Sequence, residues 1–97
     1  MPAESVRHWA TPVAVSIHEV PCRTVASVYE EFRRDVMLRL SQTDSKEAIL
    51  YRFFDATVAR AHAHDISGYL RKVKGKGASN VRNRGKELYI WRGKNWG

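Results

Sequence analysis

The apolar residues between Thr24 and Gln42 follow a pattern that constrains the fold more than any other feature of this chain. They recur at steps of three and four residues, which is the period of one face of an α-helix. This stripe consists of Val25, Val28, Tyr29, Phe32, Val36 and Leu40. Charged residues such as Glu31 and Arg34 lie off the stripe. The pattern therefore predicts an amphipathic helix that ends near Ser41 or Gln42.

The size of the chain limits how many domains it can form. Its 97 residues suffice for one domain with a single modest core. With 43% apolar and 28% charged residues, the composition is typical of folded proteins. Residues 1–11 are polar and unpatterned, and we expect a flexible arm there. Residues 12–97 are predicted to form one small basic α+β domain.

A short strand is expected before the first helix. Val13, Val15 and Ile17 alternate with smaller or polar residues, which is the period of a half-buried strand. Pro21 is expected to end this strand.

A second long helix is predicted to begin at Asp44. Glu47 follows three residues later, as in a capping box. The apolar residues beyond it occupy too wide an arc for a surface helix, and they are Ile49, Leu50, Phe53, Phe54, Ala56 and Val58. We interpret this segment as the central helix, with Phe53 and Phe54 as core anchors.

A third, short helix with a basic face is predicted from Asp65 onward. Asp65 is a suitable N-cap, and Gly75 and Gly77 would stop the helix. Its apolar face would carry Ile66, Tyr69, Leu70 and Val73, and its polar face Ser67, Gly68, Arg71 and Lys72. The alternative is one continuous helix over Asp44–Lys74 with a solvated basic end.

The chain is expected to end in a hairpin. Residues 80–82 and 87–91 have strand character and flank a turn that contains Gly85. Leu88 and Ile90 would face one side, with Tyr89 and Trp91 on the other. The predicted fold is thus α+β, with two long helices, a short basic helix and a small antiparallel sheet or wing hairpin.

Positive charge is concentrated in the last third of the chain. Residues 60–97 hold ten Lys and Arg against two acids, a net charge of +8, whereas residues 1–59 hold seven against eight. Tyr69, Tyr89, Trp91 and Trp96 fall in the same basic segment. Cationic side chains displace counterions from phosphates and flat rings stack on bases, so this combination favours a nucleic-acid partner.

Residues 57–91 resemble the end of a winged helix-turn-helix domain. A helix rich in small residues, a break near His64, a basic-faced helix and a basic hairpin follow one another. The resemblance implies that the second helix enters the DNA major groove through Ser67, Gly68, Arg71 and Lys72. It also implies backbone contacts from the wing residues Arg82, Arg84 and Lys86. DNA is therefore favoured over RNA.

The predicted function is nucleic-acid binding without catalysis, as in a small regulator or an accessory factor of a phage or mobile element. The predicted binding residues are Ser67, Arg71, Lys72, Lys74, Lys76, Arg82, Arg84, Lys86, Tyr89, Trp91, Arg92 and Lys94.

Two other functions fit the same sequence. In the first, the chain is an inhibitor or adaptor that docks its basic aromatic C-terminus on an acidic or nucleic-acid-binding site of a larger complex. In the second, it is similar to RelE-like toxins, basic ribonucleases that act on messenger RNA at the ribosome. The order of strand, two helices and basic strands carries that resemblance, and it implies Arg82, Arg84 and Tyr89 as candidate catalytic groups. A homodimer through the helix over Val25–Leu40 also remains open.

No metal, cofactor or membrane partner is predicted. His62 and His64 are two residues apart, so on one unbroken helix they point in nearly opposite directions and cannot converge on an ion with Asp65. The break expected near His64 would allow them to converge, with His8 or His18 as a further ligand, but no feature of the sequence requires such a site. The lone Cys22 favours a reducing compartment, and no apolar stretch approaches the ~20 residues that span a membrane. These features favour a cytoplasmic location.

Overall fold

The computed structural model describes residues 12–20, 25–44 and 46–96, and the side chains of residues 25–28 are not described. The predicted arm over residues 1–11, Pro21 and Cys22 lie outside the described residues. The elements in chain order are β1 (Val13–Val20), α2 (Val25–Gln42), β2 (Glu47–Phe53), α3 (Ala56–Lys74), β3 (Ser79–Arg84) and β4 (Glu87–Arg92).

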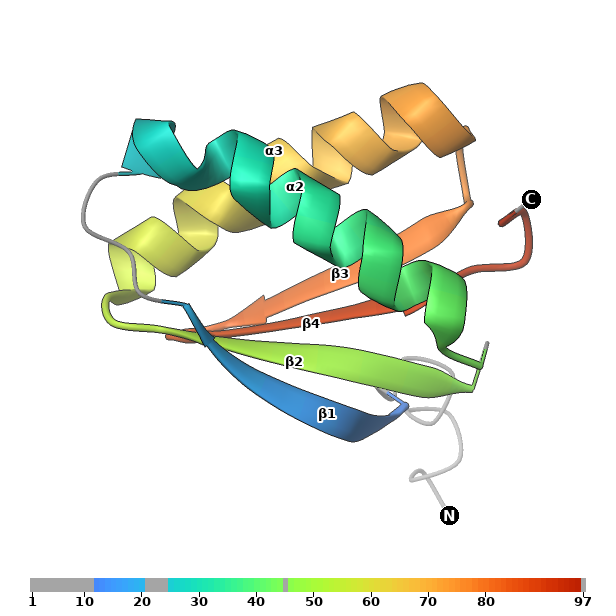
Figure 1. Ribbon diagram of the computed structural model, residues 1–97, viewed down its shortest axis with the longest axis horizontal. Coiled ribbons are helices and arrows are strands. Elements are labelled where there is room, and N and C mark those ends of the chain that lie inside the picture. Colours follow the sequence, from blue (N-terminus) through green and yellow to red (C-terminus); the bar gives the residue numbers. More distant parts are fainter. Residues whose placement is uncertain (1–11, 21–24, 45, 97) are drawn as a thin grey trace, which may run out of the picture.

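The described elements form two layers. The four strands make a mixed sheet in the order β1-β2-β4-β3, and both helices pack on one face of it (Figure 1). Strands β1 and β2 are parallel because α2 crosses over between them, whereas β2–β4 and β4–β3 are antiparallel. The other face of the sheet is covered by neither helix.

The core lies between the helices and the sheet. Helix α2 contributes Phe32, Val36 and Leu40, and α3 contributes Ala59, Ala63, Ile66 and Leu70. From the sheet come Ile49, Tyr51 and Phe53 on β2 and Leu88 and Ile90 on β4. The predicted stripe of the first helix is thus confirmed at its three described core positions, and α2 ends at Gln42 as expected.

The prediction of a second helix from Asp44 is wrong in its first half, because residues 47–53 form the central strand β2. Ile49 and Phe53 face the helices, while Ala48 and Leu50 are buried on the opposite face. A strand that is buried on both faces is apolar without alternation, and over a short run it cannot be told from a buried helix.

The capping-box pair exists, but it closes a turn instead of starting a helix. The backbone N–H of Asp44 donates to Glu47 Oε1 at 3.1 Å, and the N–H of Lys46 donates to Asp44 Oδ1 at 3.2 Å. The N–H of Glu47 also donates to the carbonyl of Asp44 at 3.0 Å. These bonds satisfy the same donors as a helix cap, and they lead directly into β2.

Helix α3 begins later than predicted and runs without a break. Asp55 is its N-cap, and one carboxylate oxygen accepts from the N–H of Thr57 at 2.6 Å and of Val58 at 3.3 Å. Asp65 is therefore not a cap, and its carboxylate accepts from Arg33 Nε of α2 at 2.9 Å. The predicted short basic helix is the second half of α3, and the alternative continuous helix over residues 44–74 is also wrong.

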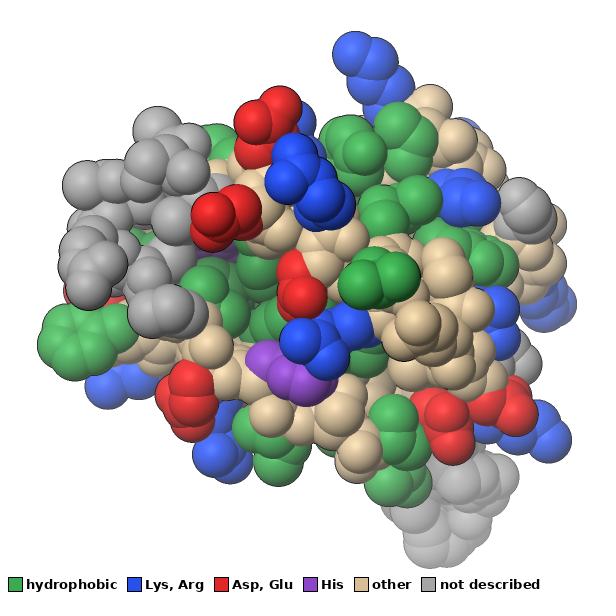
Figure 2. Space-filling model, in the orientation of Figure 1, with side chains coloured by type: hydrophobic (Ala, Val, Ile, Leu, Met, Phe, Trp, Pro, Cys, Tyr) green, Lys and Arg blue, Asp and Glu red, His purple; other side chains and the backbone are tan. Residues whose placement is uncertain are grey.

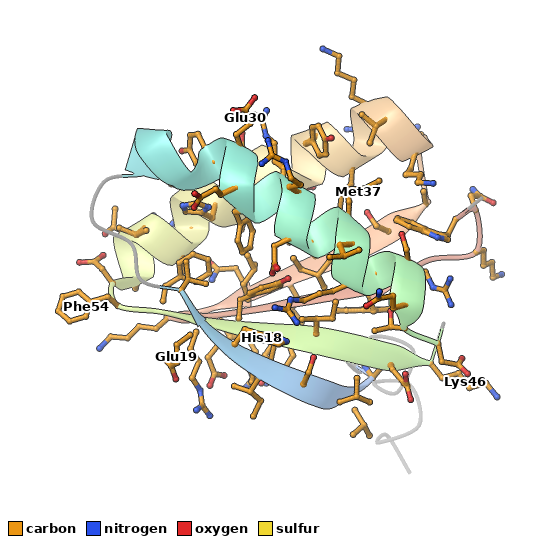
Figure 3. All side chains as sticks on the ribbon, viewed as in Figure 1. His18, Glu19, Glu30, Met37, Lys46 and Phe54 are labelled. Carbon is orange, nitrogen blue, oxygen red and sulfur yellow. The ribbon has the colours of Figure 1, made fainter. Side chains whose placement is uncertain are left out.

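At several single positions, the observed burial also differs from the predicted burial. Phe53 is a core anchor as predicted, but Phe54 is 83% exposed and projects from the end of the domain (Figure 3). On β1, Val13, Val15 and Ile17 are exposed, so the apolar side of this edge strand does not face the core. The hairpin is confirmed as β3 and β4, and the helix stops at Gly75, whose φ is +104°.

The fold class needs correction as a whole. The chain is α+β, but it has two helices and a four-stranded mixed sheet in place of three helices and a small antiparallel sheet. Among the described residues, neither helix has the length and apolar character needed to cross a membrane.

Candidate nucleic-acid interface

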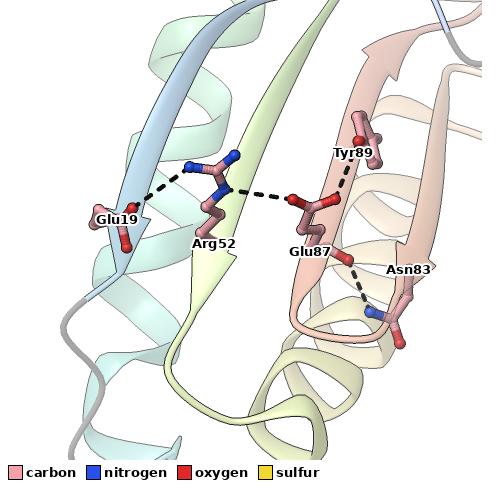
Figure 4. A network of polar contacts seen from close by, with 5 residues as sticks. All are labelled: Glu19, Arg52, Asn83, Glu87 and Tyr89. Carbon is pink, nitrogen blue, oxygen red and sulfur yellow. Dashed lines mark hydrogen bonds and ion pairs between the residues drawn. The ribbon is translucent and has the colours of Figure 1, made fainter.

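Aromatic side chains of β4 lie on the sheet face that the helices leave open. Side chains alternate along a strand, and Leu88 and Ile90 are buried in the core. Tyr89 and Trp91 therefore point to the other side, as the sequence predicted, and both are partly exposed. Figure 4 views this open face with the helices behind the sheet, and Tyr89 lies on the near side.

The register places polar and cationic residues of β3 beside the two rings. Tyr89 pairs with Arg82, and Trp91 pairs with Asn80. On the other flank, Tyr89 and Trp91 pair with Leu50 and Ala48 of β2, which are both buried. We call Asn80, Arg82, Arg84, Tyr89 and Trp91 the sheet face. It combines two partly exposed aromatic rings with exposed cationic and polar side chains of the edge strand.

One end of the open face is closed by a row of ion pairs. Arg52 of β2 lies between Glu19 of β1 at 4.0 Å and Glu87 of β4 at 3.3 Å (Figure 4). The hydroxyl of Tyr89 donates to Glu87 Oε1 at 3.1 Å, and the side-chain amide of Asn83 donates to the carbonyl of Glu87 at 2.9 Å. The bond to Glu87 therefore holds the Tyr89 ring between the ion pairs of Arg52 and the exposed arginines of β3.

The predicted binding residues on α3 lie on the other side of the molecule. Ser67, Arg71 and Lys76 line a hollow between α3 and the loop that leads to β3. Lys72 is exposed on a different helix face, and the ammonium of Lys74 lies 4.6 Å from the centre of the Trp96 ring. The structure thus divides the predicted set between the open sheet face and the α3 side.

The remaining predicted residues lie at the ends of the sheet. Lys86 is in the β3–β4 turn, and Lys94 is in the tail. Arg92 follows the alternation of Leu88 and Ile90, so it points to the helix side.

The tail after β4 is fixed to the α3–β3 loop, which the sequence did not indicate. The N–H of Gly93 donates to the carbonyl of Ala78 at 2.8 Å, and the side-chain amide of Asn95 donates to the carbonyl of Lys76 at 3.1 Å. A Cβ on Gly77 would lie 2.8 Å from the Asn95 amide nitrogen, and its φ is +79°, so this close packing depends on glycine. Trp96 packs against the core.

A second hollow, of about 540 Å³, opens between β1 and α2 and was not expected from the sequence. Its polar lining includes His18, Asp35, Arg39 and Tyr51. Acidic, basic and histidine side chains meet on this face in Figure 2, and His18 is labelled in Figure 3. Arg39 and Tyr51 both donate to Asp35 Oδ2 at 2.8 Å, so these groups mainly satisfy one another. Burial, reinforced by Arg39, lowers the pKa of His18.

The other two candidate histidines, His62 and His64, lie in different environments. The His62 ring is fully buried against Tyr29, Phe32 and Phe53, with centroids 4.9 to 5.1 Å away. Burial lowers its pKa, and the Asp65 carboxylate opposes this effect in part. His64 is exposed. Within the part of the chain that the structure describes, no three His, Cys, Asp or Glu residues are placed to hold a metal ion.

The order of elements bears on both resemblances. Helix α3 continues past His64 and Asp65, so the helix pair of a winged helix-turn-helix is not formed there. Strand β2 separates the two helices, whereas the comparison with RelE-like toxins rested on two consecutive helices. No protein-family model, curated protein or solved structure matches the chain.

Proposed function

We propose that this chain binds single-stranded nucleic acid without cleaving it, and that the bases stack on the sheet face. The observation that carries the proposal is the pair Tyr89 and Trp91, two residues apart on a central strand and both partly exposed on the face without helices. Aromatic side chains on an open four-stranded sheet stack unpaired bases in known RNA-binding modules. Every base has a π-face, so such a surface tolerates many sequences.

The charges around the rings support the same partner. Arg82 and Arg84 lie on β3 beside Tyr89 and Glu87, and both are exposed. Glu87 is shared with Arg52, so the acid nearest to the rings is already neutralised by another residue. Phosphates can therefore approach from the β3 edge while bases lie over β4. A flat sheet suits an unpaired strand better than a duplex, whose bases are stacked on each other.

The preference for DNA over RNA stays a prediction, because it was inferred only from the winged-helix resemblance. A direct comparison of unpaired DNA, unpaired RNA and duplex DNA by fluorescence anisotropy decides it. We expect single strands to bind more tightly than the duplex, with a slope of log affinity against log salt near −0.7 per phosphate contact.

The aromatic residues are tested with Tyr89→Leu and Trp91→Leu. Each variant should weaken single-strand binding by about fivefold to a hundredfold, because stacking on one ring is worth about 1–3 kcal/mol. Phe54→Leu is the matched control, since Phe54 is a highly exposed ring outside the sheet face. Equal affinities in all three variants would remove the sheet face from the interface.

Absence of binding to every oligonucleotide at low salt, with circular dichroism showing a folded protein, would contradict the proposal. That result would favour the inhibitor or adaptor, which uses the same basic aromatic surface against another protein.

A further inference from the structure

A groove runs between α3 and the edge strand β3, on the opposite side of β3 from the sheet face. It consists of two adjoining hollows of about 280 and 160 Å³ that both include Ser67 in their lining. Arg60, Ser67 and Arg71 of α3 line it at steps of seven and four residues, so they share one helix face. We call these two hollows together the α3–β3 groove.

The described lining of the groove is cationic and polar, without an acid. Arg60, Arg71 and Lys76 supply the charge, and Ser67 and Ser79 supply hydroxyl donors. The nearest acid on the same helix, Asp65, accepts a hydrogen bond from Arg33 of α2 and so is turned to the α2 side of α3. A chain of phosphates would find several donors there and no carboxylate to repel it.

The groove and the sheet face meet at β3. Arg82 and Arg84 point to the sheet face. Val81 and Asn83 alternate with them along β3, so they point to the other side and line the groove. Strand β3 is the last strand of the sheet, so its outer edge also presents backbone N–H groups that no described strand pairs. The two surfaces thus lie on opposite faces of a single edge strand, and a bound strand can pass from one to the other around the outer edge of β3.

We infer that the α3–β3 groove holds the sugar–phosphate backbone of the same single strand whose bases stack on Tyr89 and Trp91. The ligand is then an unpaired segment that continues around the β3 edge, and a segment confined to the sheet face is too short to fill the site. This inference rests on the proposed function and adds the path and minimum length of the strand.

The test uses a length series of fluorescent oligothymidylates from about 4 to about 16 nucleotides, which covers the site sizes of single-strand-binding folds. The test variant is the double substitution Arg60→Gln and Arg71→Gln. The control is Arg34→Gln with Lys72→Gln, which removes the same charge from exposed positions that do not line the groove. All of these side chains are at the surface, and circular dichroism confirms that both variants are folded.

We expect wild-type affinity to rise with length, and the test variant to lose this rise while it binds the shortest oligonucleotide like the control. Its salt slope on long oligonucleotides should also be less steep by about 1.4, from two lost contacts of about 0.7 each.

Three results would overturn the inference. If the test variant matches the control at every length while Tyr89→Leu still weakens binding, the groove is not on the path and the proposed function stands. If the test variant weakens short and long oligonucleotides equally, the groove does not extend the site. If the wild type binds none of them, the proposed function and the inference both fail.

Discussion

The hydroxyl of Tyr51 donates to Asp35 Oδ2 at 2.8 Å, and the same oxygen accepts from Arg39 Nε at 2.8 Å. This relationship ties the central strand β2 to α2 across the edge of the core. Burial and the bond to Asp35 raise the pKa of Tyr51, so its hydroxyl is protonated and can donate at neutral pH. Asp35 is partly exposed, so solvent screens its charge and reduces the contribution of the bond.

Tyr51→Phe should lower the free energy of unfolding by about 1–2 kcal/mol, because it removes a hydrogen bond to a charged group but keeps the ring in place. Urea denaturation measures the change. A double-mutant cycle with Asp35→Ala should give a coupling energy of at least about 0.5 kcal/mol. Strictly additive effects would show that the bond contributes nothing to stability.

Phe53 and Phe54 are neighbours with opposite environments, and they form a natural matched pair. Phe53→Ala should cost about 3–5 kcal/mol, because the ring is buried against Phe32 and His62. Phe54→Ala should change stability by less than about 0.5 kcal/mol, because its ring is in solvent. Thermal or urea unfolding of the two variants tests this difference, and similar midpoints would contradict the assignment of β2.

Sequence reasoning succeeded where the local pattern had one interpretation. The stripe that includes Phe32, Val36 and Leu40 has a helical period over about four turns, and it became α2. Gly85 between two strand-like runs predicted the hairpin, and alternation then placed Tyr89 and Trp91 on one side. The aromatic half of the candidate site was therefore accessible from the sequence.

It failed where tertiary contacts decide the structure. Residues 48–51 are buried on both faces of an inner strand, and no local pattern in the sequence places β2 between β1 and β4. Asp65 resembles a helix cap in sequence, yet it lies in the middle of α3, and its observed partner is Arg33, 32 residues away. The α3–β3 groove was missed for the same reason, because it combines a helix face with an edge strand whose pairing no local pattern specifies.

The buried His62 and the half-buried His18 predict that stability depends on pH. Burial lowers the pKa of His62 and of His18, so near neutral pH the folded protein binds fewer protons than the unfolded chain. Stability should therefore be fully present above about pH 6.5, the unfolded value, and should fall as the pH drops below it.

Melting temperatures between about pH 7.5 and pH 5.5 measure this effect with little interference from carboxylates. His62→Leu should reduce the decrease, whereas His64→Gln, at an exposed position on the same helix, should leave it unchanged. An unchanged pH dependence in His62→Leu would show that His62 does not cause the loss of stability.

We expect no hydrolysis of RNA or DNA by the purified protein, with or without magnesium or zinc. Of the two histidines on α3, the ring of His62 is enclosed in the core and cannot reach a phosphate. His64 lies in the lining of the α3–β3 groove, so a backbone bound there would lie near its ring. Histidine alone does not complete the reaction, because cleavage of a phosphodiester needs one group to accept a proton and another to donate one. Incubation of labelled single- and double-stranded substrates, followed by gel electrophoresis, tests the expectation. Cleavage that disappears in His64→Ala would make the groove an active site, and cleavage that disappears in Tyr89→Phe or Arg82→Ala would favour the toxin-like ribonuclease.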